Sequence, residues 1–216
     1  MKKIEKKIFS DRKNYTKDQL DEKLIEKNPI VQFEKWLELA IKADVEEPHV
    51  TVLSTATKTG KPSARIVLLR KFSENGFSFY TNYTSRKGKE LAQNPYATLT
   101  FFWQSLEKQI RIEGIIEKQT KAESDEYFAS RPHESKIGAW ASPQSKTIKN
   151  RSEIDTAFAA YEKKFSRTEI PRPSHWGGYV LKPTIIEFWQ GRKGRLHDRV
   201  LYTLKKNVWT ISRLAP

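Results

Sequence analysis

The stretch VTVLSTATKTGKPSARIVLLRKFSENGFSFYT, residues 50–81, decides which fold this sequence predicts. It contains three runs rich in β-branched, aliphatic and aromatic residues, at residues 50–56, 63–71 and 77–81. Turn sequences separate these runs, and Asn75-Gly76 is the strongest short-range signal for a hairpin. The stretch therefore predicts three consecutive antiparallel strands.

The rest of the chain adds helices between further strands. Asn28 and Pro29 form a helix start, and apolar residues at spacings of three and four continue the helix to near Asp44. Other helices are predicted at residues 86–93, 121–130 and 152–165, the last capped by Ser152, with a loop at residues 131–149. Other strands are predicted at residues 97–103, 109–117, 178–181, 185–190, 195–204 and 208–213. This order predicts a mainly β fold with inserted helices (α+β), an antiparallel barrel without a glycine-rich nucleotide-binding loop.

Length and composition predict one folded domain with a polar arm. The 216 residues are 37% hydrophobic and 12% aromatic, enough for a sizeable core, so residues 28–216 are predicted to form a single domain. Residues 1–27 are polar and weakly periodic, which predicts a mobile arm with a short helix around residues 17–27. Residues 1–7 lack the apolar stretch of a signal peptide, and no run of about 18 apolar residues occurs. We therefore expect a cytoplasmic protein with no membrane partner.

Cysteine and histidine usage excludes several kinds of site. The chain has no cysteine, which excludes disulfides, thiolate metal sites, iron–sulfur clusters and thiol nucleophiles. The four histidines lie far apart and form no ligand motif: His49, His133, His175 and His197. No metal site is therefore predicted.

The formal net charge of +14 requires an anionic partner or a solvated lysine-rich surface. Nucleic acid, an anionic membrane and phosphorylated small molecules are the candidate partners. A nucleic-acid-binding module would interleave cations with exposed aromatic residues, whereas the strand aromatics here occupy core-like positions. We therefore expect no nucleic-acid partner.

Two segments place cations where an anion would stabilise them. Ser85 is a good helix cap, yet Arg86 and Lys87 follow it in the first turn, where they oppose the helix dipole unless a phosphate binds. Arg65 and Arg70 bracket an apolar strand and should point to opposite faces, so each would bind its own phosphate. A solvated first turn and snorkelling strand ends are the alternatives.

Two further segments have the composition of a ligand site. Alternation places Arg195, His197 and Arg199 on one face of a strand, where they would repel one another unless an anion or an electron-rich ring lay among them. An exposed basic strand is the alternative. The segment at residues 131–145 carries Ser, Arg and Gln donors that could bind a phosphate or a heterocycle edge, although serine-rich loops are common.

Together these segments resemble the pyridoxine/pyridoxamine 5′-phosphate oxidase family, flavin mononucleotide (FMN) enzymes with an antiparallel split β-barrel. The resemblance extends from about residue 12 to the last residue. The matching segments are RIVLLR (65–70), FYTN (79–82), SRK (85–87), SRP (130–132), SKIGAW (135–140), QS (144–145), WGG (176–178), EFWQG with RLHDR (187–199) and RLAP (213–216).

The resemblance implies roles for individual residues. The residues that contact the flavin phosphate and ribityl chain are Arg65, Arg86, Lys87, Gln144 and Ser145. Arg65 begins a cofactor-binding run that continues through Ile66, Val67, Leu68, Leu69 and Arg70. The flavin ring is approached by Tyr80, Thr81, Gln109, Trp189 and Arg199. Substrate phosphate is held by Arg70, Tyr127, Arg131 and Ser135, the catalytic pair Arg195 and His197 holds the pyridine ring, and Arg12 with Tyr15 closes over the substrate. The family more often has Lys at the position of Arg70, but a guanidinium also binds phosphate.

The resemblance also implies the reaction. Hydride would leave C4′ of pyridoxamine or pyridoxine 5′-phosphate for the flavin, yielding pyridoxal 5′-phosphate, and O₂ would then be reduced to H₂O₂. A homodimer with flavin at the subunit interface is expected. The alternative is a flavin-binding split barrel with another redox substrate.

Overall fold

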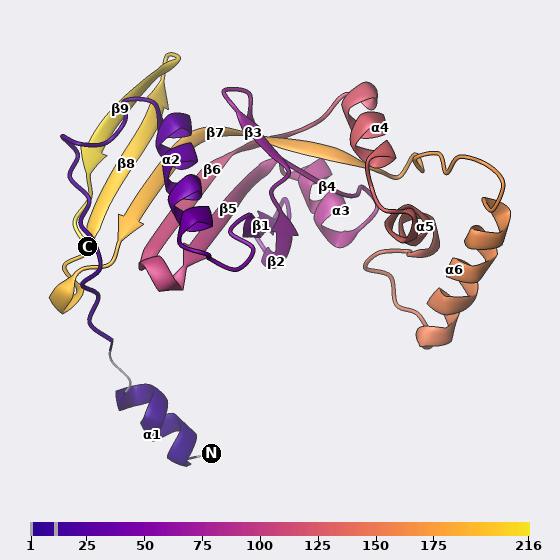
Figure 1. The fold of residues 1–216 in the computed structure, drawn as a ribbon, viewed down its shortest axis with the longest axis horizontal. Helices are drawn as coiled ribbons and strands as arrows, with labels where there is room; N and C mark the ends of the chain where they lie inside the picture. Colours follow the sequence, from indigo (N-terminus) through magenta and orange to yellow (C-terminus); the bar gives the residue numbers. More distant parts are fainter. Residues whose placement is uncertain (1, 11–12) are drawn as a thin grey trace. The chain divides into compact units, whose positions relative to one another are not determined.

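The computed structural model describes residues 2–10 and 13–216. Its contacts divide the chain into two compact units. Unit 1 comprises Met1–Pro48, Phe101–Arg111 and Ile185–Pro216, and unit 2 comprises His49–Thr100 and Ile112–Thr184. The long strands β5, β6 and β7 therefore contribute residues to both units (Figure 1).

An antiparallel sheet is the main structure of the described chain. Its strands follow the order β2-β1-β5-β6-β7-β4-β3, and β8 pairs with both β7 and β9. The strands are β1 (Val50–Ala56), β2 (Pro62–Leu68), β3 (Lys71–Ser73), β4 (Gly76–Asn82), β5 (Tyr96–Trp103), β6 (Lys108–Lys118), β7 (Trp176–Gln190), β8 (Asp198–Lys205) and β9 (Val208–Arg213). The predicted mainly β fold with inserted helices is confirmed.

Helices α1 and α2 precede the first strand, and the other helices occupy connections between strands. The helices are α1 (Lys2–Ser10), α2 (Pro29–Lys42), α3 (Arg86–Gln93), α4 (Lys121–Ala129), α5 (His133–Ala141) and α6 (Arg151–Lys164), with short 3-10 turns η1 (Gln104–Leu106) and η2 (Lys193–Arg195). The predicted helix around residues 17–27 is wrong, because this segment follows an irregular path. The predicted arm at residues 1–27 and single domain at residues 28–216 remain predictions.

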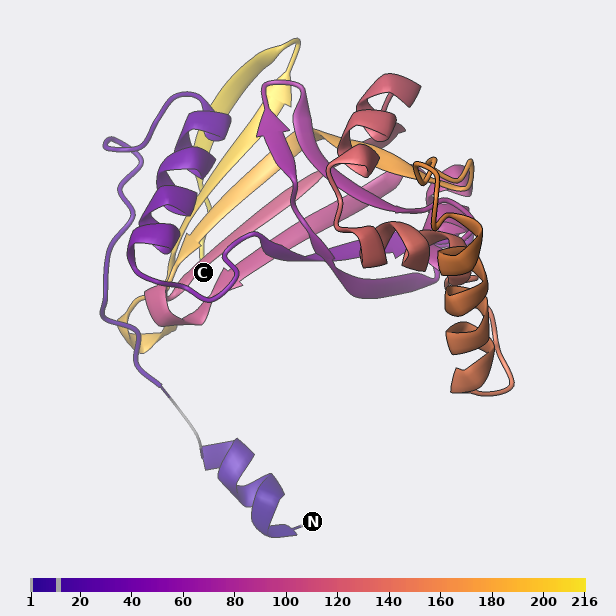
Figure 2. The same ribbon diagram turned by 45° about the vertical axis from the view of Figure 1, so that its right-hand side comes forward.

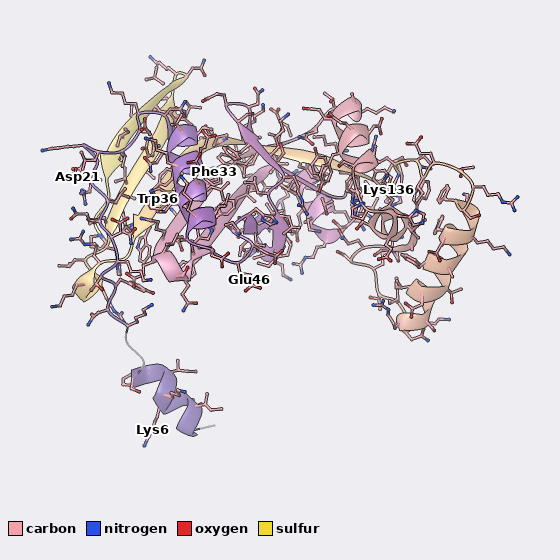
Figure 3. The ribbon with its side chains drawn as sticks, viewed as in Figure 1. Lys6, Asp21, Phe33, Trp36, Glu46 and Lys136 are labelled. Atoms are coloured by element: carbon pink, nitrogen blue, oxygen red, sulfur yellow. The ribbon has the colours of Figure 1, made fainter. Side chains whose placement is uncertain are left out.

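Helix α2 shows how local sequence builds unit 1. The Asn28 side chain accepts a hydrogen bond from the Ile30 amide at 2.8 Å, and Pro29 occupies the first helical position, as predicted. Phe33 and Trp36 leave the helix on its buried face, and both are labelled in Figure 3. Their rings pack edge-on against Phe101 of β5 and Phe188 of β7, at centroid distances of 5.3 and 5.1 Å.

Unit 2 contains a helix, α5, and a helix cap that were not predicted from the sequence. The predicted loop at residues 131–149 includes α5, whose Ile137 and Ala141 are buried. Ile137 belongs to a core cluster with Phe128 and Phe165, so burial favours a helix although serine and proline flank it. Figure 2 shows α5 and α6 side by side, in agreement with their contacts. The cap of α6 is Asn150, which accepts from the Glu153 amide at 3.3 Å, in place of the predicted Ser152.

Strand β7 continues where two strands were predicted. Pro183, which cannot donate to a ladder, lies between the two predicted strands, residues 178–181 and 185–190. Gly114 of β6 faces this point, and a Cβ atom there would lie 2.0 Å from the Lys182 carbonyl oxygen. The absence of a side chain at Gly114 therefore allows close backbone approach, and the strand passes through Pro183 without a break.

Candidate functional site

A cavity of about 740 Å³ in unit 2 collects most of the residues predicted to bind phosphate. It is lined by Ile66, Val67 and Leu68 of β2, Arg70 after β2, Tyr80 and Thr81 of β4, Lys87 of α3, Tyr127 of α4, Ser130, Arg131 and Pro132 between α4 and α5, Ser135 of α5, Gln144 after α5, and Trp176 of β7. The four predicted substrate-phosphate residues, Arg70, Tyr127, Arg131 and Ser135, all line it. Strands, helices and loops from distant parts of the sequence thus meet at one cavity.

The charged side chains that line this cavity all have one sign. Arg70, Lys87 and Arg131 line it, and none of the described lining residues is acidic. Three cations in one partly closed space repel one another, and an anion would relieve that repulsion. The cavity is therefore suited to a multiply charged anion such as a phosphate ester.

Arg131 offers an unsatisfied donor. Its Nη1 atom is buried and has no hydrogen-bond partner within the described residues. The guanidinium carbon lies over the Trp176 ring, 4.6 Å from its centre, which is within cation–π range. Burial lowers the pKa of Arg131, and the nearby Arg70 charge lowers it further. A buried donor without a partner is costly, so a ligand acceptor at this position would be strongly stabilised.

Hydrogen bonds also hold the Lys87 ammonium in place at the cavity, where it could bind an anion. Its ammonium donates to Thr81 Oγ1 at 3.1 Å and to Gln144 Oε1 at 3.0 Å. Burial, and then repulsion from Arg65, lowers the pKa of Lys87 to about 8. Ser85 caps α3 as predicted, with its hydroxyl 3.3 Å from the Gly88 amide, so Lys87 lies in the first turn of a capped helix.

Aromatic rings form a stack beside the cations. The Tyr80 and Tyr127 rings are 3.8 Å apart and inclined by 18°, and Trp176 is nearly parallel to both, at 5.6 and 6.2 Å. All three line the cavity. They give it a flat apolar surface suited to a planar heterocycle.

Not every predicted phosphate residue reaches the cavity. Arg65 and Arg86 instead bind the buried carboxylate of Glu90, at 3.2 and 2.9 Å. Leu69 is buried and absent from the lining, and Ser145 is exposed with a left-handed φ of 69°. Since β2 ends at Leu68, Arg70 lies beyond the strand that was expected to contain it.

Unit 1 contains the second group of predicted residues. The His197 ring lies 4.6 Å from Trp189 and 5.8 Å from Tyr15, and Tyr15 meets Trp189 edge-on at 5.7 Å. Tyr15 lies directly on Gly191, where a Cβ atom would come within 2.6 Å of its ring. The glycine is therefore needed for this three-ring cluster.

Hydrogen bonding assigns the tautomer of His197. Its Nδ1 accepts from the Arg192 amide at 3.0 Å, so in the neutral ring Nε2 carries the proton. Burial, and then the Arg195 charge, lowers the pKa of His197, which favours this neutral form. The predicted strand through Arg195 and His197 is wrong: β8 begins at Asp198, and Arg195 is an exposed residue of η2 with φ 64°.

Arg199 is held by a second buried glutamate. Its Nε donates to Glu187 at 2.7 Å and its Nη1 donates to the Ala215 carbonyl at 2.9 Å. Arg111 of β6 binds the other oxygen of Glu187 at 3.0 Å. Gln109, two residues earlier on β6, is half-buried. Arg12, the remaining predicted residue, lies outside the described residues.

Glu90 and Glu187 are the site residues that the sequence analysis missed. A signal existed for Glu90, since it lies four residues after Arg86 on the same helix, a spacing at which side chains meet. No comparable local signal links Glu187 to Arg111, because the two residues are 76 positions apart and meet only through the sheet.

Residues 2–10 and 13–216 hold neither a metal-ion site nor a membrane-crossing helix. Their histidines, aspartates and glutamates form no group of three that could hold a metal ion. None of their helices combines the length and apolar character that a membrane crossing requires.

The antiparallel sheet with its cationic, aromatic-lined cavity fits one class of protein, the flavin-binding split barrel. Residues 37–165 match the family model "Pyridoxamine 5'-phosphate oxidase", and residues 176–216 match "Pyridoxine 5'-phosphate oxidase C-terminal dimerisation region". The chain belongs to the pyridoxine/pyridoxamine 5′-phosphate oxidase family. This confirms the resemblance, the split-barrel fold and the prediction of a flavin-dependent oxidoreductase with FMN as cofactor.

Individual relatives agree with this assignment. Pyridoxine/pyridoxamine 5′-phosphate oxidases of Cyanothece sp. and Polynucleobacter asymbioticus are 50% and 52% identical, each over 95% of this chain and 96% or 97% of the relative. The crystal structure of PhzG from Burkholderia lata, in complex with tetrahydrophenazine-1-carboxylic acid, is 31% identical. It superposes with a TM-score of 0.87, covering 92% of this chain and 98% of that one.

Proposed function

We propose that this chain oxidises pyridoxamine 5′-phosphate and pyridoxine 5′-phosphate to pyridoxal 5′-phosphate, with O₂ as electron acceptor and H₂O₂ as the second product. The observation that carries the proposal is the cavity of unit 2, where Arg70 and Arg131 stand beside a stack of aromatic rings. A phosphate ester of a planar heterocycle fits both features. Tyr127 and Ser135 would complete the phosphate site.

The donor set also fits the FMN phosphate. Lys87 and Gln144 line the cavity, and Arg65 and Arg86 add two guanidinium groups next to the first turn of α3. The N-terminus of a helix favours a bound phosphate because its amides and dipole attract negative charge. We assign the phosphate and ribityl contacts to these four residues together with Ser145, and the flavin-ring contacts to Tyr80, Thr81, Gln109, Trp189 and Arg199.

The protein's part in the reaction is to orient the substrate and to compensate charge. Bound FMN supplies the acceptor for the hydride that leaves C4′ of the substrate, and O₂ then takes up the electrons. Arg199, held by Glu187, would offset negative charge that develops on the flavin. His197, whose Nε2 carries the proton, would donate a hydrogen bond to the substrate, and Arg195, two residues earlier in the chain, would help to orient the ring.

A split barrel acting on another redox substrate is the second candidate, and PhzG gives it a concrete form. The molecule named in that crystal structure is a ring carboxylic acid. Arg70 and Arg131, the two lining cations assigned to the substrate, match a phosphate dianion better than a carboxylate of one charge. We therefore favour the phosphorylated pyridines.

Product analysis tests the proposed function. Purified protein supplied with pyridoxine 5′-phosphate in air should form pyridoxal 5′-phosphate and H₂O₂ in equal amounts, and the released flavin should be FMN. Unphosphorylated pyridoxine should react far more slowly. Turnover of ring carboxylic acids without turnover of either vitamin B6 phosphate would support the second candidate.

We further propose a homodimer that carries FMN at the subunit interface, in keeping with the dimerisation region matched by residues 176–216. The flavin-loaded protein is expected to have twice the 25.2 kDa mass of one chain in light scattering. Dilution to the monomer should release the flavin, because each pocket would lose the residues supplied by its partner. A monomer that retains FMN would contradict this arrangement.

FMN affinity is expected to fall as the pH rises above about 8. In the free protein Lys87 has a pKa of about 8, and a bound phosphate would raise that pKa, so binding takes up a proton at higher pH. The dissociation constant should then rise about tenfold per pH unit above 8, since one proton is linked to binding. Titration of FMN fluorescence between pH 7 and about 9.5 measures this slope, and Lys87→Met should abolish it.

Residues 13–18 are expected to serve substrate binding rather than cofactor binding. The Thr16 and Lys17 amides donate to buried Glu107 at 2.8 and 3.0 Å, and Asp18 accepts from buried Lys108 at 2.7 Å. These contacts hold Tyr15 against His197. Deleting residues 1–16 should therefore raise KM or slow turnover while flavin binding and thermal stability stay nearly intact.

Deletion of residues 1–10 is the matched control, because it removes α1 and leaves Tyr15 and its contacts in place. It should behave like the full chain. Full activity of the longer deletion, measured below KM, would show that the arm is only a tail.

A further inference from the structure

The buried carboxylate of Glu90 binds two cations of the proposed FMN phosphate site, Arg65 and Arg86. The side chain of Glu90, on the inner face of α3, is only 6% exposed. Its Oε2 accepts from Thr55 at 2.5 Å, from Ser63 at 2.6 Å and from Arg65 at 3.2 Å. Its Oε1 accepts from Arg86 Nε at 2.9 Å. Four donors from three elements, β1, β2 and α3, thus converge on one carboxylate.

The same group of residues fixes Arg65. Its Nη1 donates to Thr55 Oγ1 at 2.5 Å and to the Leu53 carbonyl at 3.3 Å, and its Nη2 donates to Ser63 Oγ at 2.5 Å as well as to Glu90. A long side chain held at both terminal nitrogens has lost its rotamer freedom before a ligand arrives. The guanidinium charge is therefore fixed in one position in the ligand-free protein.

The negative charge of Glu90 has two opposing effects on phosphate binding at this site. It would repel the phosphate, which disfavours binding. It also offsets the mutual repulsion of Arg65, Arg86 and Lys87, and it opposes the effect of Arg65 on the Lys87 pKa. Burial alone would raise the pKa of Glu90, yet hydrogen bonds from Ser63, Thr55 and the two arginines hold it at about 2, so the charge persists at every physiological pH.

We infer that Glu90 is a positioning residue for FMN binding: it holds Arg65 and Arg86 in the geometry that receives the FMN phosphate. This inference rests on the proposed function for those two arginines. The inference predicts the direction in which FMN affinity changes when Glu90 is neutralised. If Glu90 were only a nearby negative charge, neutralising it would strengthen FMN binding, whereas loss of a positioning residue weakens it.

The test compares FMN with riboflavin, which has the same ring and no phosphate. Full-length protein depleted of flavin is titrated with each, as wild type and as Glu90→Gln. The variant is expected to bind FMN roughly 10- to 100-fold more weakly, because charge-assisted contacts to the phosphate lose their alignment. Riboflavin affinity should change by less than about twofold, since the ring contacts are untouched.

The matched control is Asp155→Asn, which neutralises a carboxylate in another arginine pair four residues apart, Arg151 with Asp155 on α6, where both side chains are exposed. It should leave both affinities unchanged. If Glu90→Gln does not fold, Glu90→Asp keeps the charge but withdraws it by one methylene, and it should show the same loss confined to FMN.

The possible outcomes distinguish a failure of the positioning role of Glu90 from a failure of the proposed phosphate site. Unchanged or tighter FMN binding in the Glu90 variants, or an equal loss for FMN and riboflavin, would overturn the positioning role. A wild-type protein that binds FMN no better than riboflavin would instead contradict the proposed phosphate site itself.

Discussion

Replacing Arg131 with Met is expected to lower kcat/KM for pyridoxine 5′-phosphate by about 100- to 1,000-fold. The guanidinium has a buried Nη1 without a partner and stacks on Trp176 at 4.6 Å, so it is already oriented before substrate arrives. Truncating one member of a buried charge pair costs about 2 to 5 kcal/mol, and each 1.4 kcal/mol is about a tenfold change. Met keeps the length and the apolar contact, so the loss reports the charge.

Steady-state kinetics with two substrates would measure this effect. Unphosphorylated pyridoxine should react equally slowly with wild type and variant, because it does not use Arg131. Arg151→Met, which removes an exposed arginine of α6 in the same unit, is the control and should match wild type. An equal loss for pyridoxine and its phosphate would place Arg131 outside the phosphate site.

Replacing His197 or Arg195 with Ala is expected to slow reduction of the flavin by roughly 10- to 1,000-fold while the protein stays yellow and folded. His197 is oriented by the Arg192 amide and by the Trp189 ring at 4.6 Å, which leaves its Nε2 hydrogen for the substrate. Lost positioning of a reacting ring raises the barrier by a few kcal/mol, which gives a rate change of this size.

Rapid mixing with pyridoxine 5′-phosphate without oxygen would measure that step. Lys193→Ala is the control, because Lys193 is an exposed cation of the same turn η2. Unchanged flavin reduction in both the His197 and the Arg195 variants would refute their assignment.

Much of the fold could be predicted because its signals are local. The cap and apolar face of α2, the bounds of β1 and α3, and the hairpin turn within residues 73–76 all depend on residues close in sequence. Elements that depend on distant contacts were missed. Helix α5 is stabilised by burial of Ile137 in a cluster with Phe128 and Phe165, and β7 continues past Pro183, where Gly114 of β6 allows close backbone approach.

The sequence predicted which residues belong to the candidate site, but it predicted their positions only in part. Arg195 and His197 were placed on one strand face by simple alternation, which fails because the backbone turns at Gly194 and Arg195, with φ of 67° and 64°. The cavity brings Arg70 and Arg131 together, as expected of a shared phosphate site. Arg65 instead belongs to a network organised by Glu90, and no pattern within β2 could reveal a partner on another element.

One measurement tests the central claim most directly: mixing the flavin-loaded protein with pyridoxine 5′-phosphate in the absence of oxygen. We expect the flavin absorbance to bleach, pyridoxal 5′-phosphate to form in an amount equal to the flavin, and air to restore the colour with release of H₂O₂. Flavin that stays oxidised with both pyridoxine and pyridoxamine 5′-phosphate, in protein that binds FMN, would contradict the proposed reaction.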